Sequence, residues 1–262
     1  MSTDGLKTVS MRASDGNTVH LEYHESLRST SELAKKYALS GYPDRYAVIT
    51  EELTNGEDGK TAQHGIYLSL ILRPSFFPSQ ARHLAPLAAV SLVSALEEQT
   101  EASVGIGWVS SIYCEGERIG GAAIEGKLDS FMAYEYIIVS FAAKIDPQTF
   151  PPRLTDLVKR VFEEDNSSLG SIIAKNIINN FFKFYINIKS TAKFMDIYRK
   201  KSVLIGEKVV YLSGGKRKRC TAVGIDAETG ALLIEAKDGN IISVSSPTGI
   251  ILPKTVKKQK SK

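Results

Sequence analysis

The sequence predicts a mixed α/β fold, in which helices pack on a β-sheet, followed by a small β-barrel. Residues 104–126 have the pattern of a β-hairpin, with apolar side chains alternating on both sides of the turn Glu115-Gly116-Glu117. Strand-like and helix-like segments alternate on both sides of this hairpin as far as residue 202. From residue 203 only short strands follow, separated by glycine-containing turns, and this rhythm is typical of a small barrel.

Composition places the chain among globular proteins. Its 262 residues are 43% hydrophobic and 24% charged, enough for a sizeable core in one large domain or two. No apolar run reaches the roughly 20 residues that span a bilayer, and the N-terminus is too polar for a signal peptide. Cys114 and Cys220 are far apart and lack metal-ligand spacing, as do the four histidines. We therefore expect reduced thiols, a cytoplasmic protein without a membrane segment, and no metal site.

The net charge of +4 comes from one end of the chain. The tail 254–262 holds five lysines and no acid, so the other 253 residues sum to −1, which is 4 minus 5. A second basic cluster, Lys216-Arg217-Lys218-Arg219, follows two glycines. Nucleic-acid contact is one interpretation, but no aromatic residue interleaves these cations and no helix-turn-helix precedes them. We favour a disordered, solvated tail and an exposed turn, and we expect no DNA-binding domain.

The first third of the chain predicts an edge hairpin and a capped helix. Apolar side chains alternate over residues 9–13 and 19–23, around the turn Asp15-Gly16-Asn17, so residues 1–18 form an N-terminal extension or an edge hairpin. Ser29 or Thr30 is placed to cap the helix that follows. A short buried strand over 47–50 and a flexible glycine-containing loop over 51–60 come next.

Periodicity predicts the remaining elements. Helical spacing indicates a helix over 81–98, with Pro86 in its first turn. Phe150-Pro151-Pro152 breaks the chain before two further helices. The predicted strands are 66–72 and 134–143, the two later helices are 154–164 and 169–198, and the barrel strands are 209–212, 219–225, 232–235, 241–243 and 249–252.

The central hairpin carries three features beyond its turn. It contains Trp108, the only tryptophan in the chain, and it places Arg118 at its mouth. Gly120 and Gly121 stand inside the second strand, and this predicts a close backbone approach to a ligand or to another strand. By itself the pattern is also typical of a purely structural hairpin.

The hairpin resembles the central hairpin of the biotin–protein ligases. In that family the hairpin has the sequence Lys-Trp-Pro-Asn-Asp-Leu-Tyr, followed by a short turn and then Lys-Leu-Ala-Gly-Ile-Leu-Val-Glu. Trp108, Tyr113, Gly121 and Glu125 match without a gap, and so does the cation at Arg118. In this frame the family's catalytic lysine falls on Gly107, and its Asn and Asp fall on Ser110 and Ser111. The scaffold is kept while these reactive groups are missing.

The resemblance covers about residues 19–253: three other segments match the ligase-like part, and Gly224-Ile225-Asp226 with Gly230-Ala231-Leu232-Leu233-Ile234 resembles the family's SH3-like C-terminal domain. Ser29-Thr30 match the Ser-Thr of a motif that lines the biotin pocket in the family. Gly56, Gly59 and Lys60 fall in the loop that carries the family's adenylate-wrapping arginines, but Glu57 and Asp58 replace arginines there. The family's closing Gly-x-Gly-Ile-Asn motif falls on Ser140, Ala142, Ala143 and Lys144. The resemblance implies a ligase-like domain over 19–202, with a mixed sheet, and an SH3-like domain over 203–253.

The resemblance implies an activity and also casts doubt on it. Biotin–protein ligases form biotinyl-AMP from biotin and ATP and pass biotin to a lysine of a carrier domain, which requires cations at the phosphates. Because the position of the family's catalytic lysine holds Gly107, no catalytic residue is assigned. The candidate ligand-binding residues are Ser29, Thr30, Gly56, Gly59, Lys60, Trp108, Arg118, Gly120 and Gly121.

Three hypotheses follow. The first is a non-catalytic ligase-like protein, a pseudoenzyme, that binds the carrier domain of a carboxylase, a partner in a homo- or heterodimer, or a small ligand. The second is a divergent active ligase that uses biotin and ATP, in which Lys60, Lys144 or Arg118 replaces the missing cations. The third is a small-molecule sensor that keeps the acyl pocket. Titration with biotin and with biotinyl-AMP separates them.

Overall fold

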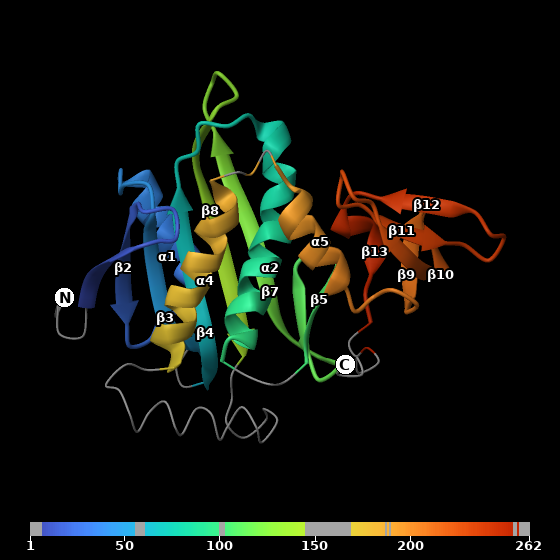
Figure 1. Ribbon diagram of the computed structural model, residues 1–262, viewed down its shortest axis with the longest axis horizontal. Helices are drawn as coiled ribbons and strands as arrows, with labels where there is room; N and C mark the ends of the chain where they lie inside the picture. Colours follow the sequence, from blue (N-terminus) through green and yellow to red (C-terminus); the bar gives the residue numbers. More distant parts are fainter. Residues whose placement is uncertain are drawn as a thin grey trace.

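The computed structural model describes residues 7–55, 61–99, 103–144, 169–186, 188, 190–253 and 256 (Figure 1). Within these residues, an eight-stranded mixed sheet with packed helices is followed by a five-stranded antiparallel sheet. This confirms the predicted fold class. The predicted helix over 154–164 and most of the basic tail lie outside the described residues.

The larger sheet has the strand order β1-β2-β3-β4-β8-β7-β6-β5. Only β2 and β3 pair in parallel, and every other neighbouring pair is antiparallel. The strands are β1 Lys7–Arg12, β2 Thr18–His24, β3 Tyr46–Asn55, β4 Thr61–Leu72, β5 Val104–Gly107, β6 Ser111–Cys114, β7 Glu117–Leu128 and β8 Tyr134–Lys144.

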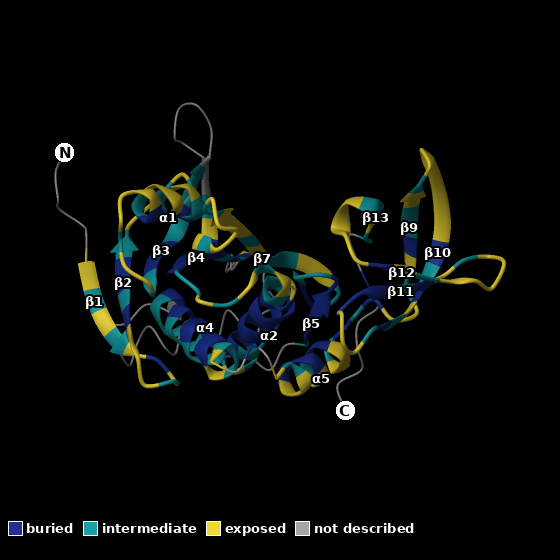
Figure 2. Ribbon diagram, turned by 90° about the horizontal axis from the view of Figure 1, so that it is seen from above, coloured by how far each residue is buried: buried dark blue, intermediate teal, exposed yellow. Residues whose placement is uncertain are grey.

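The helices divide unequally between the two faces of this sheet (Figure 2). The helices α2 Leu84–Glu97, α4 Leu169–Tyr185 and α5 Ala192–Lys200 lie on one face, which we call the back face. The helix α1 Thr30–Leu39 lies on the other, the front face. A short 3₁₀ helix, η1 Pro78–His83, leads into α2.

Helix α2 forms the centre of the back-face core. Eleven of its 14 residues are buried, including Pro86 in the first turn. A helix that is apolar on all sides is stable only when it is covered on all sides. Helix α2 packs on the sheet and is flanked by α4 and α5. The same apolar cluster runs from the sheet strands through α4 and α5 into the smaller sheet.

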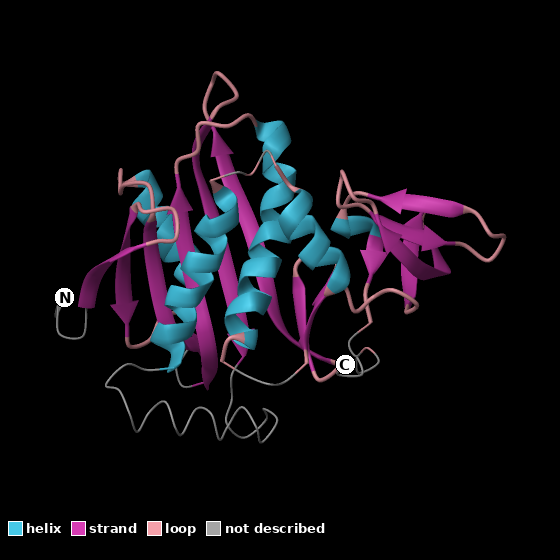
Figure 3. Cartoon of the chain, viewed as in Figure 1, coloured by secondary structure: helices cyan, strands magenta, loops and turns pink. Residues whose placement is uncertain are grey.

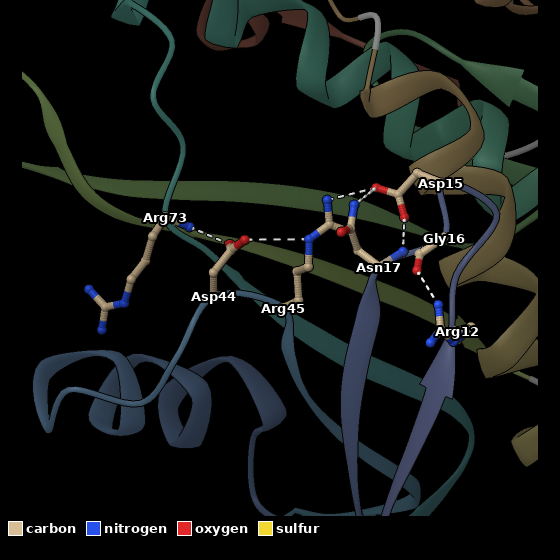
Figure 4. Close-up of polar contacts among 7 residues, drawn as sticks. All are labelled: Arg12, Asp15, Gly16, Asn17, Asp44, Arg45 and Arg73. Atoms are coloured by element: carbon tan, nitrogen blue, oxygen red, sulfur yellow. Dashed lines mark hydrogen bonds and ion pairs between the residues drawn. The ribbon is translucent and has the colours of Figure 1, made fainter.

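An arginine clamp holds the first hairpin to the sheet (Figure 4). Arg45, at φ 61°, donates from Nη2 to Oδ2 of Asp15 at 2.7 Å, and its Nε lies 3.5 Å from Asp44. Asp15 also accepts from the backbone N–H of Asn17 at 3.1 Å, within the predicted turn. The backbone N–H of Arg73 donates to Asp44 at 2.7 Å.

Three predicted boundaries are corrected by the structure. The segment 104–113 is not one strand: β5 and β6 pair with each other across a turn at residues 108–110. Residues 51–55, predicted as loop, continue β3 because they pair with the start of β4. The helix predicted over 169–198 is divided, since α4 ends at Tyr185 and α5 begins at Ala192.

The smaller sheet has the order β12-β11-β10-β9-β13 and confirms the predicted run of short strands (Figure 3). A 3₁₀ turn, η2 Pro247–Gly249, precedes its last strand. Backbone hydrogen bonds join Ile106 of β5 to Lys201 and Val203 at 2.7 and 3.0 Å, where the chain enters this sheet. The strands are β9 Lys208–Ser213, β10 Lys216–Ile225, β11 Leu232–Glu235, β12 Ile241–Val244 and β13 Ile250–Ile251.

Candidate functional site

Alternation along β4 and β8 defines the front face beyond α1. Ile71 of β4 and Ile138 of β8 pack against Ala34 and Ala38 of α1 and therefore point to the front. Residues at two-residue steps from them share that face. These positions carry polar side chains where the sheet emerges from under α1: Tyr67, Ser69 and Ser140, which together with Thr30 we call the polar strip.

The start of α1 separates the two members of the predicted Ser-Thr pair. Ser29 is the N-cap, and its hydroxyl accepts from the backbone N–H of Glu32 at 3.2 Å. It also lies 3.0 Å from the hydroxyl of Ser31. Thr30 is buried and faces the sheet. Ser29 therefore fixes the helix start, which places Thr30 over β4.

Three hydroxyls form a hydrogen-bonded chain across the front face. Ser69 Oγ donates to Thr30 Oγ1 at 2.8 Å and lies 2.9 Å from Ser140 Oγ. Because a hydroxyl has one proton and Ser69 gives its proton to Thr30, Ser140 is the donor to Ser69. The chain of donation ends at Thr30, for whose own proton the described residues supply no acceptor.

Tyr67 contributes a second spare donor to the polar strip. Its side chain is 4% exposed, and its buried hydroxyl has no hydrogen-bond partner within the described residues. Burial raises the pKa of Tyr67 to about 12, so the group remains a neutral donor. A Cβ at Gly65 would lie 3.0 Å from this hydroxyl, so the glycine leaves room for it. A buried hydroxyl without a partner carries a desolvation cost that a ligand acceptor would remove.

The two hairpin glycines are required by the protein's own backbone. A Cβ at Gly120 would overlap the carbonyl oxygen of Ala142 on the adjacent strand. A Cβ at Gly121 would lie 2.5 Å from the carbonyl oxygen of Ser110. Of the two predicted alternatives, a close approach to another strand therefore accounts for Gly120, and a close approach to the β5–β6 turn accounts for Gly121.

Gly107 lies against an aromatic ring. A Cβ there would be 2.5 Å from Cε2 of Tyr113, which is buried. Tyr113 is fixed in turn, because its hydroxyl donates to the carbonyl oxygen of Pro253 at 2.6 Å. Next to it, the hydroxyl of Ser110 donates to the carbonyl oxygen of Ala122 at 2.7 Å. Position 107, where the sequence resemblance predicts the family's lysine, therefore has no room for a side chain in this arrangement.

Trp108 is buried at the junction of the two sheets. Its indole N–H donates to the carbonyl oxygen of Gly230 at 2.8 Å. An indole has one donor, so any contact of Trp108 with a ligand would be made by its ring. The hydrogen bond fixes the β5–β6 turn relative to the smaller sheet.

Two cations stand at one end of β7 and β8. Arg118 and Lys144 are both exposed, and neither forms an ion pair with a described residue. Residues 118 and 144 lie close to the register pair Gly120–Ala143, so both lie at the same end of the paired strands β7 and β8. The other predicted loop candidates, Gly56, Gly59 and Lys60, lie outside the described residues, as do Glu57 and Asp58.

Sequence reasoning missed Tyr67 and Ser69 as site residues. The signal was present in the strand Gly-Ile-Tyr-Leu-Ser-Leu-Ile, where polar residues recur every second position between buried leucines and isoleucines. That alternation indicates a polar face on an otherwise buried strand.

The polar strip contains neutral groups only, and it offers hydrogen bonds rather than proton transfer. Within the described residues, no group of three or more His, Cys, Asp or Glu side chains is placed to hold a metal ion. Within the described residues, Cys114 and Cys220 are buried and form no disulfide. None of the described helices is long and apolar enough to cross a membrane.

Comparison with known proteins relates this arrangement to one family, although no family model matches the chain. Over 252 residues the chain is 27% identical to the bifunctional ligase/repressor BirA of Bacillus subtilis, and the match covers 90% of this chain and 73% of that protein. The BirA of Bacillus spizizenii is 26% identical over 253 residues, with the same coverage. The chain is thus similar, at low identity, to two bifunctional ligase/repressor proteins.

Solved structures show the same fold. The biotin protein ligase of Aquifex aeolicus, in complex with biotin and ATP, aligns with a TM-score of 0.64 at 22% identity, over 90% of this chain and 99% of that one. A biotin protein ligase-like protein of unknown function from Silicibacter aligns with a TM-score of 0.63 at 14% identity, over 87% and 94%. Both match the larger sheet together with the smaller one, since each alignment spans most of the chain.

Proposed function

We propose that this chain is a biotin protein ligase-like binding protein that holds an acyl ligand on its front face and does not form an adenylate at an enzyme's rate. The observation that carries the proposal is the ring of Tyr113 beside Gly107. Adenylate formation needs cations where charge develops on the phosphates. The ring of Tyr113 occupies the space that a lysine side chain at position 107 would need.

The acyl side of the site supports ligand binding. The polar strip presents two donors for which the described residues supply no acceptor, the hydroxyls of Thr30 and Tyr67, beside the apolar floor of the sheet. Apolar surface with a few directed hydrogen-bonding groups is typical of small-ligand sites. These donors suit a ligand whose head group has a carbonyl oxygen, as the ureido ring of biotin does.

We further propose that the ligand is presented to, or received from, the carrier domain of a carboxylase. One structural relative, from Helicobacter pylori, is named a biotin acetyl coenzyme A carboxylase synthetase. The exposed residues of β7, such as Ala123 and Glu125, leave the front face open beside the polar strip. Two buried cysteines that form no disulfide within the described residues suit a reducing, cytoplasmic setting.

A divergent active ligase is the second candidate. The observation that favours it is the pair of exposed cations, Arg118 and Lys144, at the same end of β7 and β8. Two cations at this end of the strands would neutralise part of the charge of a triphosphate. Under this alternative the protein binds biotin and biotinyl-AMP and releases pyrophosphate.

Calorimetric titration with biotin and with biotinyl-AMP tests the proposal. We expect biotin to bind, and biotinyl-AMP to bind no more tightly, because the phosphate side lacks its lysine. Biotin-dependent pyrophosphate release at about 1 per second or faster would establish the alternative instead. Absence of binding by either compound would contradict an acyl site.

A pair of matched variants locates the ligand. Ala123 is exposed and lies opposite Ser140 in the register of β7 and β8, so Ala123→Trp covers the polar strip without displacing core atoms. Ala133 is exposed in the distant β7–β8 turn, so Ala133→Trp adds the same bulk away from the site. We expect the first to abolish biotin binding and the second to leave it unchanged. Equal binding by both variants would place the ligand elsewhere.

A further inference from the structure

The two-stranded ribbon formed by β9 and β10 ends in a run of positive charge. The turn at its tip is Gly214-Gly215, with φ values of 56° and 73°, which glycine adopts without strain. Four consecutive cations follow, and all four are exposed: Lys216, Arg217, Lys218 and Arg219. We call this segment, Ser213 to Arg219, the basic ribbon.

The charge of the basic ribbon is not compensated within the described part of the chain. None of its four cations forms an ion pair with a described residue. The nearby carboxylate of Asp238 is engaged with its own turn, where it accepts from the backbone and side-chain N–H groups of Asn240 at 3.2 and 2.9 Å. These hydrogen bonds, helped by the charge of Lys218, hold the pKa of Asp238 below its usual range. Concentrated charge of one sign repels itself unless a partner neutralises it.

Two further cations extend the positive surface at the base of the ribbon. Lys208 and Lys237, with Arg219, line a cavity of about 490 Å³. Lys208 donates to the hydroxyl of Thr221 at 2.7 Å, and Glu235 is the one carboxylate in the lining. The cavity therefore has three cations against one anion, which favours an acidic ligand.

The direction of the ribbon places this charge near the front face. Figure 2 shows β9 and β10 rising from the smaller sheet on the side of the larger sheet that carries α1. The exposed strand β7 lies between α1 and the ribbon of β9 and β10. A protein that approached the front face would meet the basic ribbon at its rim.

We propose that the basic ribbon binds an acidic surface of the protein partner that docks on the front face. Only the location of that partner rests on the proposed function; the charge complementarity stands independently. Such complementarity accelerates encounter and suppresses wrong partners. The ribbon thus supplies a recognition contact outside the ligand site.

The arrangement of the cations favours a polypeptide over nucleic acid. Successive side chains alternate between the two faces of a strand, so Lys218 and Arg219 point to opposite sides and offer no single track for a phosphate backbone. Tyr211, the aromatic residue opposite Lys218, is half-buried and packs against the core, so it offers no stacking platform.

Fluorescence anisotropy with labelled poly-L-glutamate tests this proposal. The test variant changes Lys216, Arg217, Lys218 and Arg219 to glutamine. The control changes four other exposed lysines to glutamine, Lys7, Lys36, Lys193 and Lys200, so that both variants lose the same net charge. Each exposed ion pair contributes a factor of roughly 1.5 to 5 in binding, so we expect about tenfold or more weaker binding from the test variant and about twofold or less from the control.

Two outcomes would overturn the proposal. Equal losses from the two variants would mean that net charge alone attracts the probe. Tighter binding of duplex DNA than of poly-L-glutamate, lost in the same variant, would assign the ribbon to nucleic acid. Circular dichroism melting establishes that both variants are folded.

A parallel titration with biotin separates the ribbon from the ligand site. The ribbon variant is expected to bind biotin as the parent does, because none of its four residues touches the polar strip. If biotin fails to bind the parent while poly-L-glutamate discriminates between the variants, the acyl site is wrong and the ribbon proposal stands.

Discussion

The two faces of the larger sheet are built from different interactions. The back face is covered by three helices, and side chains such as Leu87 of α2 and Phe181 of α4 are fully buried among apolar neighbours. Of the described helices, only α1 lies on the front face, and beyond it hydroxyls and exposed residues continue. The difference indicates that the back face supplies most of the stability, whereas the front face remains available to a ligand.

Helix α1 is attached to the front face partly through polar groups. The buried carboxylate of Glu22 accepts from the hydroxyls of Tyr37, at 2.8 Å, and Tyr46, and lies 2.7 Å from the ring of His24. At the same end of the helix, Arg73 donates to the carbonyl oxygen of Ala38 at 2.8 Å. Directional hydrogen bonds of this kind fix the position of α1, and therefore of Thr30, although the apolar contact between α1 and the sheet is small.

The largest expected effect is on the back face. Phe181 packs edge-on against Phe141 of β8 and Phe182 of α4. Phe181→Ala leaves a cavity that rigid neighbours cannot fill, and we expect a loss of about 3–5 kcal/mol in the free energy of unfolding. Urea denaturation measures it. Phe131→Ala is the matched control, because Phe131 is 89% exposed, and its effect should be within about 0.5 kcal/mol. Similar losses in both would contradict the division between core and surface.

A smaller effect is expected at the anchor of α1. Glu22→Ala leaves the hydroxyls of Tyr37 and Tyr46 without their acceptor, and we expect a loss of about 2–3 kcal/mol. Glu125→Ala removes an exposed carboxylate of the same face, whose pair with Lys35 spans 3.5 Å, and should cost less than about 1 kcal/mol. If the two variants unfold at the same urea concentration, α1 does not depend on its polar anchor.

Tyr67→Phe is expected to change stability and binding in opposite directions. Removing a buried hydroxyl that has no partner among the described residues should stabilise the ligand-free protein by about 1 kcal/mol. The same change should weaken biotin binding, because the ligand loses a donor. Thermal unfolding with and without biotin measures both effects. A destabilised ligand-free variant would mean that the hydroxyl already has a partner.

The smallest effect is a pH dependence on the back face. His83 is buried beside the ring of Phe194, and burial, with the charge of Arg82, lowers its pKa. The unfolded chain therefore takes up the proton first as the pH falls, so stability is lost as pH decreases through about 6.5 toward the folded pKa, and is retained above that range. Urea denaturation between about pH 5 and 8 follows this loss. His83→Gln should flatten the profile, and an unchanged slope would assign it to other groups.

Local patterns in the sequence determined the element types and several of their ends. Alternation predicts β4 and β8, helical spacing predicts α2 with Pro86 in its first turn, and a serine before a helical segment predicts the N-cap at Ser29. Each of these signals involves residues within one or two turns of the chain, so the sequence alone contains them. The resemblance of the central hairpin likewise predicted the fold, because its spacing reflects strand register.

Only the tertiary structure decided what the candidate site contains. Thr30, Ser69 and Ser140 are separated by 39 and 71 residues, and their hydroxyls meet because β4 and β8 pair beneath α1. The indole N–H of Trp108, a predicted ligand-binding residue, donates to the carbonyl oxygen of Gly230, 122 residues away. The physical reason is the same in each case: strand pairing and sheet packing set these distances, and no local propensity encodes which distant side chain will fill a given space.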